Sequence, residues 1–274
     1  MPAGREVANV QRRQMEAHNT TGIEPINADS LWLIGARAKG GHRNNVYHGN
    51  FAPQIPNDLI RRFTAEDDVV LDMFMGSGTT LFECETLNRR FIGFDINKTI
   101  LETVRKQISS SPFRKYTMHL CNVCDTESVK TLLTDDLNTF GRKYADIVFS
   151  HPPYLNIIRF TEESSDLSHL ADLHVFTKAY LHGVENIWPF LKKDGILVLV
   201  VGDIYSNREV VPLGFTLMDA IRQNFNCLLK GIVVKDMVGN RAKIGQEALW
   251  RYRALKWGTF LFKHEYVFVF RKTR

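Results

Sequence analysis

The stretch Val69-Val-Leu-Asp-Met-Phe-Met-Gly-Ser-Gly-Thr-Thr80 joins a short apolar run to a glycine-rich turn, and a helical pattern follows directly. Glycines at such a corner let the backbone approach a ligand, and the first turn of the next helix favours an anionic group. We therefore predict a strand, a binding turn and a helix in succession. A tight turn with a Ser/Thr cap and a phosphate loop are the alternatives, although a Walker-type loop needs a lysine that this stretch lacks.

The rest of the chain repeats this alternation. Further short apolar runs, which suit doubly buried strands, cover residues 91–95, 116–121, 145–150 and 195–202. Helical patterns cover residues near 78–88, 97–109, 125–137, 172–191 and 213–224, and Pro56-Asn-Asp58 introduces a short amphipathic helix that ends near residue 63. The last two runs, 227–235 and 266–271, have no helix between them and are expected to be antiparallel. The rhythm predicts an α/β fold with a mostly parallel sheet covered on both faces.

Length and composition limit the class of protein. The chain has 274 residues, 44% of them apolar and 24% charged, which suits one large soluble α/β domain. No apolar run approaches the roughly 20 residues that cross a bilayer, and the first residues lack an apolar signal core, so we expect a cytoplasmic protein with no membrane partner. Cys121-Asn-Val-Cys124 has the spacing of a metal or redox pair, but no second cysteine pair accompanies it, and we expect no metal.

A second carboxylate follows the next apolar run. Phe91-Ile-Gly-Phe-Asp95 places it about twenty residues after the glycine turn, at the expected end of a strand. Ligands of open α/β sheets lie beyond the carboxyl ends of the strands, where a carboxylate can accept both hydroxyls of a ribose. Asp95 taken alone also suits a helix cap. Together with the glycine turn it favours a nucleoside ligand.

A later apolar run, Asp146-Ile-Val-Phe-Ser-His-Pro-Pro-Tyr154, ends in two prolines. A Pro-Pro step fixes an extended backbone and leaves carbonyls without neighbouring amide donors, so these carbonyls can serve as fixed acceptors in the ligand crevice. Tyr154 offers a flat face on which a base could stack, worth on the order of 1–3 kcal/mol. The alternative is a strand-ending turn with a packed tyrosine.

Together these residues resemble a known family. Asp72-x-Phe74-x-Gly-Ser-Gly-Thr-Thr80 with His151-Pro-Pro-Tyr154 is similar to the motif pair of S-adenosylmethionine-dependent DNA methyltransferases that modify exocyclic amino nitrogens of cytosine or adenine. The resemblance spans about residues 45 to 272, since Tyr47-His-Gly-Asn-Phe-Ala-Pro53 looks like the family's methionine-end motif and Lys263–Lys272 like its closing strand. It implies a Rossmann-like class I methyltransferase fold with a seven-stranded, mostly parallel sheet and an antiparallel last strand. Residues 1–45 would form an N-terminal arm, and residues 46–274 the catalytic domain with a basic insertion near 236–262.

The resemblance also implies a cofactor, a substrate and residue roles. S-adenosylmethionine would lie among Phe51, Asp72, Phe74, Gly76, Ser77, Gly78, Thr79, Asp95 and Asn122. The target base would lie at His151, Pro152, Pro153 and Tyr154. The expected partner is DNA with a base flipped from the duplex, cytosine being slightly favoured over adenine, and a cognate restriction enzyme is a further expected partner. An RNA substrate and a nucleic-acid-binding subunit without catalysis are the alternatives.

Two departures qualify the resemblance, and one further segment is expected to move. The family has Asp, Asn or Ser where His151 stands; because only a neutral imidazole can accept a hydrogen bond, activity is expected to fall below about pH 6.5. The basic insertion replaces a large recognition domain, and its expected contacts with nucleic acid are Arg241, Lys243, Arg251 and Arg253, a solvated basic hairpin being the alternative. Glu162, Glu163 and Asp166 are expected to lie in a mobile loop that closes over the base, or in a solvated acidic turn.

Overall fold

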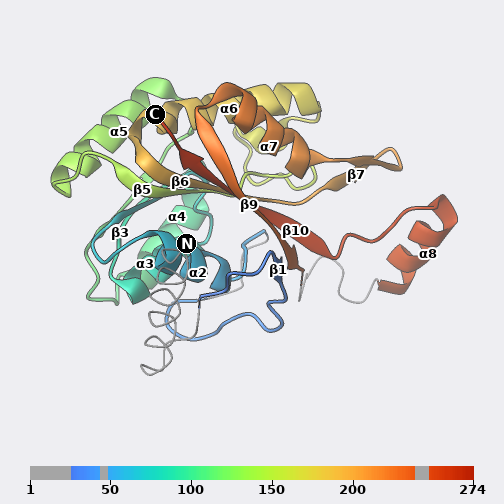
Figure 1. Cartoon of the computed structure of the whole chain (residues 1–274), viewed down its shortest axis with the longest axis horizontal. Helices are drawn as coiled ribbons and strands as arrows, with labels where there is room; N and C mark the ends of the chain where they lie inside the picture. The colour runs from blue at the N-terminus through green and yellow to red at the C-terminus, as the bar shows by residue number, and fades with distance from the viewer. Residues whose placement is uncertain (1–25, 44–48, 238–246) are drawn as a thin grey trace, which may run out of the picture.

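The computed structural model describes residues 26–43, 49–237 and 247–274, which are organised around one twisted sheet (Figure 1). The strand order is β1-β9-β10-β6-β5-β2-β3-β4. The strands are β1 (Leu31–Trp32), β2 (Val69–Asp72), β3 (Arg90–Asp95), β4 (Tyr116–Leu120), β5 (Ala145–Ser150), β6 (Leu191–Val201), β9 (Cys227–Asp236) and β10 (His264–Lys272). Strands β2 to β6 run parallel, and β10 is antiparallel to both β6 and β9. The seven predicted strands and the antiparallel last strand are confirmed, and β1 adds two residues parallel to β9.

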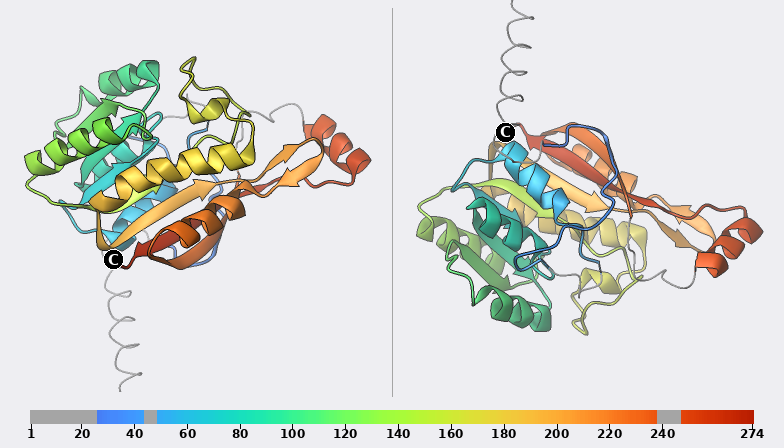
Figure 2. Two further views of the ribbon diagram at one scale, coloured as in Figure 1. Left: turned by 90° about the horizontal axis from the view of Figure 1, so that it is seen from above. Right: turned by 90° about the horizontal axis from the view of Figure 1, so that it is seen from below.

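Helices cover both faces of the sheet, as the two views of Figure 2 show. The helices are α2 (Gln54–Phe63), α3 (Thr79–Leu87), α4 (Lys98–Ile108), α5 (Thr126–Thr139), α6 (Leu173–Ile187), α7 (Leu213–Asn224) and α8 (Glu247–Trp257), with 3-10 turns η1 (Leu167–His169) and η2 (Trp188–Phe190). Apolar residues of α5, α6 and α7 pack on one face, and those of α2, α3 and α4 on the other. Alternate residues of β5 serve both layers, since Val148 faces the first and Ile147 the second. The doubly buried strands predicted from their apolar runs follow from this layering.

Helix starts follow local chemistry. The Asn97 side chain accepts a hydrogen bond from the backbone N–H of Ile100 and so caps α4. Asp125 and Asp172 cap α5 and α6 in the same way. Helix α2 begins at Gln54, earlier than predicted, because Pro56 lies in the first turn, where a backbone N–H has no partner within the helix.

The topology brings three strand ends together. After β2 the chain continues outward to β3 and β4, then returns to β5 on the other side of β2. The sheet order therefore reverses between β2 and β5, and a crevice forms outside the carboxyl ends of strands at such a point. Asp72, Asp95 and Ser150 end β2, β3 and β5 at this edge.

The segment predicted as a basic insertion projects from the sheet, and its described residues 247–262 are called the arm below (Figure 1). Its described part contains α8, so the hairpin given as the alternative is wrong for these residues. A separate hairpin of β7 (Ile204–Ser206) and β8 (Glu209–Val211) supports the arm, because the Tyr205 hydroxyl donates to the carbonyl of Phe260 at 2.7 Å. Across the described ranges, no helix has both the length and the apolar character needed to span a bilayer.

Candidate active site at the carboxyl ends of the central strands

The glycine turn after β2 is held together by Asp72. Its Oδ1 accepts a hydrogen bond from the backbone N–H of Phe74 at 3.0 Å, and its Oδ2 accepts one from the Thr80 hydroxyl at 2.5 Å. The pKa of Asp72 is raised to about 7, because the effect of burial is larger than the opposing effect of these two hydrogen bonds. Gly78 takes φ +79° before α3, and a Cβ there would lie 3.0 Å from Val104. The two hydrogen bonds of Asp72 therefore hold the turn in its conformation. Glycine at position 78 avoids a clash with Val104.

Asp95 connects the next strand end to the same turn. Its Oδ2 accepts the backbone N–H of Gly76 at 2.7 Å, and its Oδ1 accepts that of Asn97 at 2.8 Å. Burial raises the pKa of Asp95 to about 6; the hydrogen bonds oppose this effect, and the negative charge of Asp166 adds to it. Because Asn97 is the residue that caps α4, Asp95 is not the helix cap that the sequence left open.

A small, partly open cavity lies beside these groups. Its lining includes Met73, Phe74, Asp95, Asn122, Pro153 and Asp166. Three residues predicted for the cofactor and one predicted for the base therefore border one space. Ser77 and Thr79 are buried in the turn outside this lining, where the Ser77 hydroxyl accepts a hydrogen bond from Asn50.

The predicted base-binding corner follows β5. The imidazole of His151 is half-buried, and its centroid lies 5.2 Å from that of Phe51. His151 Nε2 lies 3.2 Å from the hydroxyl of Tyr154. Burial is the main cause that lowers the pKa of His151 to about 4, so the ring is neutral at pH 7. The ordinary pKa behind the expected loss of activity below pH 6.5 therefore does not apply to the folded protein. Phe51, predicted to contact the cofactor, packs on this corner and is not part of the cavity lining.

Two charged residues missed in the sequence complete this corner. The Tyr154 hydroxyl donates to Glu265 Oε1 at 3.3 Å, and Glu265 Oε2 pairs with Lys235 Nζ at 2.5 Å. Lys235 is 5% exposed, on β9. The signal in the sequence was a base and an acid at the facing ends of two strands predicted to be antiparallel, since Lys235 and Glu265 are register partners of β9 and β10.

The segment after the corner forms a wall of the cavity. Asp166 is buried and caps η1, accepting hydrogen bonds from the Ser168 N–H and the Thr161 hydroxyl. The Asn122 side chain donates to the carbonyl of Ser165 at 3.1 Å, which ties the segment to the end of β4. Asp166 is therefore not part of a solvated acidic turn, whereas Glu162 and Glu163 are exposed. Closure of this segment over a base stays a prediction.

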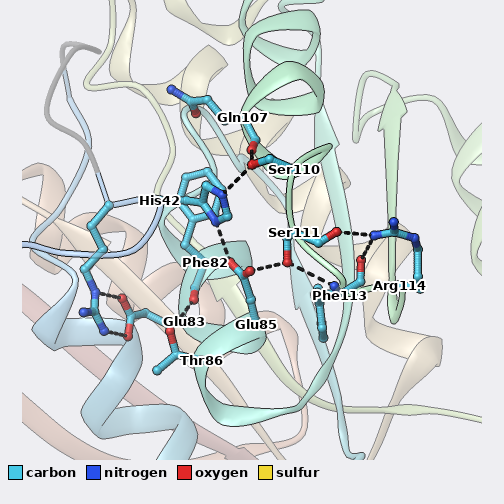
Figure 3. Close-up of polar contacts among 11 residues, drawn as sticks. His42, Phe82, Glu83, Glu85, Thr86, Gln107, Ser110, Ser111, Phe113 and Arg114 are labelled. Atoms are coloured by element: carbon cyan, nitrogen blue, oxygen red, sulfur yellow. Dashed lines mark hydrogen bonds and ion pairs between the residues drawn. The ribbon is translucent and has the colours of Figure 1, made fainter.

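An N-terminal segment, residues 42–43, makes polar contacts with α3 (Figure 3). Arg43 makes a bidentate pair with Glu83, at 2.6 and 2.7 Å, and Glu83 is fully buried. His42 Nδ1 lies 2.9 Å from Glu85, which in turn accepts a hydrogen bond from the Ser111 hydroxyl. Through these contacts, residues 42–43 of the predicted N-terminal arm support α3, the helix that starts at the glycine turn.

Arg251 and Arg253, the described residues of the predicted nucleic-acid set, lie apart from the cavity. Arg251 is exposed on α8, and the guanidinium of Arg253 lies 5.2 Å from the ring centroid of Trp250. Figure 1 places α8 at the far end of the arm, away from α3 and α4. Arg241 and Lys243 lie outside the described residues.

Sequence comparison relates this chain to DNA methylases. Residues 6–106 match a family described as DNA methylase. The chain is 33% identical over 101 residues to the Type II methyltransferase M.HpaI of Haemophilus parainfluenzae, covering 36% of this chain and 31% of that protein. It is 32% identical over 102 residues to M.MjaII of Methanocaldococcus jannaschii (37% and 17%), and 41% identical over 66 residues to M2.DpnII of Streptococcus pneumoniae (23% and 25%). The chain thus matches about a third or less of the length of these curated relatives.

The solved structure of TrmN from Thermus thermophilus shares the fold, with a TM-score of 0.50 and 17% identity over 81% of this chain and 49% of that one. The sequence matches confirm the resemblance to DNA amino-methyltransferases, and the α/β architecture confirms the predicted class I fold. The DNA methylase match also supports S-adenosylmethionine as the cofactor.

Proposed function

We propose that this protein transfers a methyl group from S-adenosylmethionine to the exocyclic amino nitrogen of a base in DNA, with cytosine ahead of adenine as the target. The observation that carries the proposal is the shared cavity at the reversal of strand order. Asp95 and Asn122 line it from the side predicted for the cofactor, and Pro153 from the side predicted for the base. The proposed donor and acceptor sites would therefore share one space, as a direct transfer between two bound molecules requires.

The residues around the cavity fit a nucleoside cofactor. Each oxygen of Asp95 has a second lone pair beyond the one used by a backbone N–H, so the carboxylate can also accept ribose hydroxyls. Phe74 and Met73 offer an apolar wall, and Asn122 lies beside it with a side-chain amide. S-adenosylmethionine would supply the methyl group as an electrophilic sulfonium.

The corner after β5 suits an amino group as the methyl acceptor. An exocyclic amine is a weak nucleophile because its lone pair is conjugated with the ring. Acceptors that bind its hydrogens favour a pyramidal nitrogen and stabilise the positive charge that develops during transfer. Neutral His151 and the carbonyl groups of the Pro152-Pro153 step are the proposed acceptors, and the Tyr154 ring is the proposed stacking surface.

Incubation with radiolabelled S-adenosylmethionine tests the proposal. Duplex DNA and RNA are supplied separately, and each is then digested to nucleosides for identification. Labelled N4-methylcytosine or N6-methyladenine in DNA would support the proposal. Label in RNA alone would move the substrate to RNA, and cofactor binding without transfer to either would favour a non-catalytic nucleic-acid-binding subunit.

Two substitutions separate the proposed roles. Asp95→Ala should weaken binding of S-adenosylmethionine about tenfold or more, through lost hydroxyl contacts. Tyr154→Ala should leave that binding intact and reduce transfer strongly, because the base loses its stacking surface. Normal transfer by the Tyr154→Ala variant would remove stacking from the proposal. A cognate restriction enzyme that cuts the same site unless it is methylated is the proposed functional counterpart.

A further inference from the structure

We propose that Glu265 is a positioning residue that sets the tautomer of His151, acting through the hydroxyl of Tyr154. This inference deepens the proposed function, because it assigns the acceptor atom that would face the target amino group. It rests on a chain of side-chain contacts that starts on the loop after β5 and ends on β9. Its four members are His151, Tyr154, Glu265 and Lys235.

The contacts join end to end. His151 Nε2 lies 3.2 Å from the Tyr154 hydroxyl, and that hydroxyl lies 3.3 Å from Glu265 Oε1. The other oxygen of Glu265 lies 2.5 Å from Lys235 Nζ. Gly202 lies alongside, where an added Cβ would come within 3.3 Å of both Tyr154 and Glu265. The corner is therefore closely packed, which limits rearrangement of the chain.

The charge on Glu265 determines which groups donate and which accept in this series of hydrogen bonds. Burial would raise the pKa of this carboxyl, but the pKa is lowered overall, first by the positive charge of Lys235 and then by His151 and by the hydrogen bonds that Glu265 accepts. An ionised carboxylate can only accept hydrogen bonds. The Tyr154 proton therefore points to Glu265, and the oxygen of Tyr154 is left to accept a hydrogen bond from His151 Nε2–H.

A neutral imidazole carries one proton, so Nδ1 must then hold a free lone pair. Within the described parts of the chain, His151 Nδ1 makes no hydrogen bond. The rings of Phe51 and Tyr154 contact the imidazole, with centroids at 5.2 and 5.8 Å, and restrict its rotation. The histidine that departs from the family motif thus presents an acceptor atom, as an Asp or Asn oxygen would.

Nitrogen-15 NMR of the histidine side chains reads the tautomer directly, without substrate. The signal of His151 is assigned among the nine histidines by its loss in His151→Asn. We expect Nε2 protonated and Nδ1 unprotonated in the unmodified protein at pH 7. Tyr154→Phe keeps the ring but removes the acceptor for Nε2–H, so the two tautomers should become mixed. Glu265→Gln should do the same, because its amide can also donate to Tyr154.

The same variants are assayed for cofactor binding and for transfer. Both should keep their affinity for S-adenosylmethionine and lose transfer by about 10- to 100-fold, as expected when an acceptor is misplaced. Tyr266→Phe is the matched control: Tyr266 is adjacent on β10, and its hydroxyl also donates to a carboxylate, that of Asp203 at 3.2 Å. This control should change neither the His151 spectrum nor the rate.

A protonated Nδ1 in the unmodified protein would overturn the inference, as would an unchanged tautomer in both Tyr154→Phe and Glu265→Gln. Because Tyr154→Phe leaves the Glu265–Lys235 pair in place, it tests the chain even if Glu265→Gln does not fold. If the expected tautomers are seen while no nucleic acid is methylated, the proposed function fails and the assignment of Glu265 stands.

Discussion

Three carboxylates at the site differ in how their charge is balanced. Glu265 pairs with Lys235, whereas Asp72 and Asp95 have no cation within salt-bridge distance among the residues that the structure describes. Burial raises the pKa of Asp72 to about 7 and that of Asp95 to about 6, from an ordinary 3.8. The folded state therefore holds their protons more tightly than the unfolded state does. These groups make the protein more stable as the pH falls from above 7 toward 4.

Asp72→Asn tests this sign. In the cofactor-free protein, the free energy of unfolding should rise less between pH 8 and pH 5 in this variant than in the unmodified protein. The difference should be on the order of 2 kcal/mol. Urea unfolding midpoints at the two pH values give the measurement. The exposed Asp135→Asn on α5 is the control and should keep the normal pH dependence. An identical pH dependence in Asp72→Asn would mean that Asp72 is ionised in the folded protein at pH 5.

The pH profile of transfer tests the environment of His151. Burial keeps the ring neutral down to about pH 4, so its acceptor atom should persist well below pH 6.5. We expect the single-turnover rate at saturating cofactor to stay within about twofold between pH 7 and pH 6. His151→Asn, which cannot titrate, is measured alongside to separate His151 from other groups. A tenfold fall that begins near pH 6.5 only in the unmodified protein would contradict the lowered pKa.

The residues that could be predicted from sequence are those tied to a strand end. Asp95 and Pro153 follow apolar runs that predict adjacent carboxyl ends, and both line the cavity. The contact of Glu265 with Tyr154 could not be predicted, because it joins a strand to a loop that lies far from it in the sequence. The pKa of His151 was likewise inaccessible, since burial of a loop residue follows from tertiary packing.

At the scale of elements, the contact between residues 42–43 and α3 supports the binding turn. Glu83 is fully buried, and Arg43 balances its charge with two hydrogen bonds. Removing one member of a buried pair leaves an uncompensated charge. Asn57 would remain as a hydrogen-bond donor to Glu83, at 2.8 Å. Removal of Arg43 should therefore lower the stability of the protein substantially, and the remaining hydrogen bond from Asn57 should offset part of that effect.

Arg43→Met should lower the free energy of unfolding by about 2–3 kcal/mol, since the Arg43 side chain is 21% exposed and one donor to Glu83 remains. Chemical denaturation measures the change. Arg222→Met is the matched control: its pair with Asp219 is about half exposed and should contribute less than about 0.5 kcal/mol. Equal effects in the two variants would show that the Glu83 pair adds nothing beyond a surface contact.

Strands and helices with a clear hydrophobic pattern could be predicted from the sequence, whereas the shortest strands could not. The runs that became β2, β3 and β5 are mostly apolar and bounded by turn residues, which identifies buried strands. Strands of two or three residues, such as β1, β7 and β8, are too short to show a period. Helix α8 was missed because it leaves Leu249, Tyr252 and Leu255 exposed and so lacks a continuous core-facing stripe.

At the scale of the whole molecule, the arm holds the basic helix α8 away from α3 and α4, the helices that begin at the candidate site (Figure 1). The arm is braced at its end, because Arg208 of the β7–β8 turn lies 5.4 Å from the ring centroid of Trp257 in α8. A long duplex can contact both the cavity and the arm, whereas a single nucleoside can reach only the cavity. The arm is therefore expected to contribute to binding of DNA and not to binding of the cofactor.

Salt dependence of DNA binding tests this division. Each neutralised phosphate contributes about 0.9 to the slope of log affinity against log salt. Arg251 is exposed, so Arg251→Gln should reduce the slope by about one. Arg253→Gln should reduce it less, because the guanidinium stacks on Trp250. Lys130→Gln on α5, at the opposite end of the molecule from α8, controls for net charge (Figure 1). Equal slopes for Arg251→Gln and Lys130→Gln would assign the arm to a solvated surface, because only a residue in contact with phosphate releases counterions on binding.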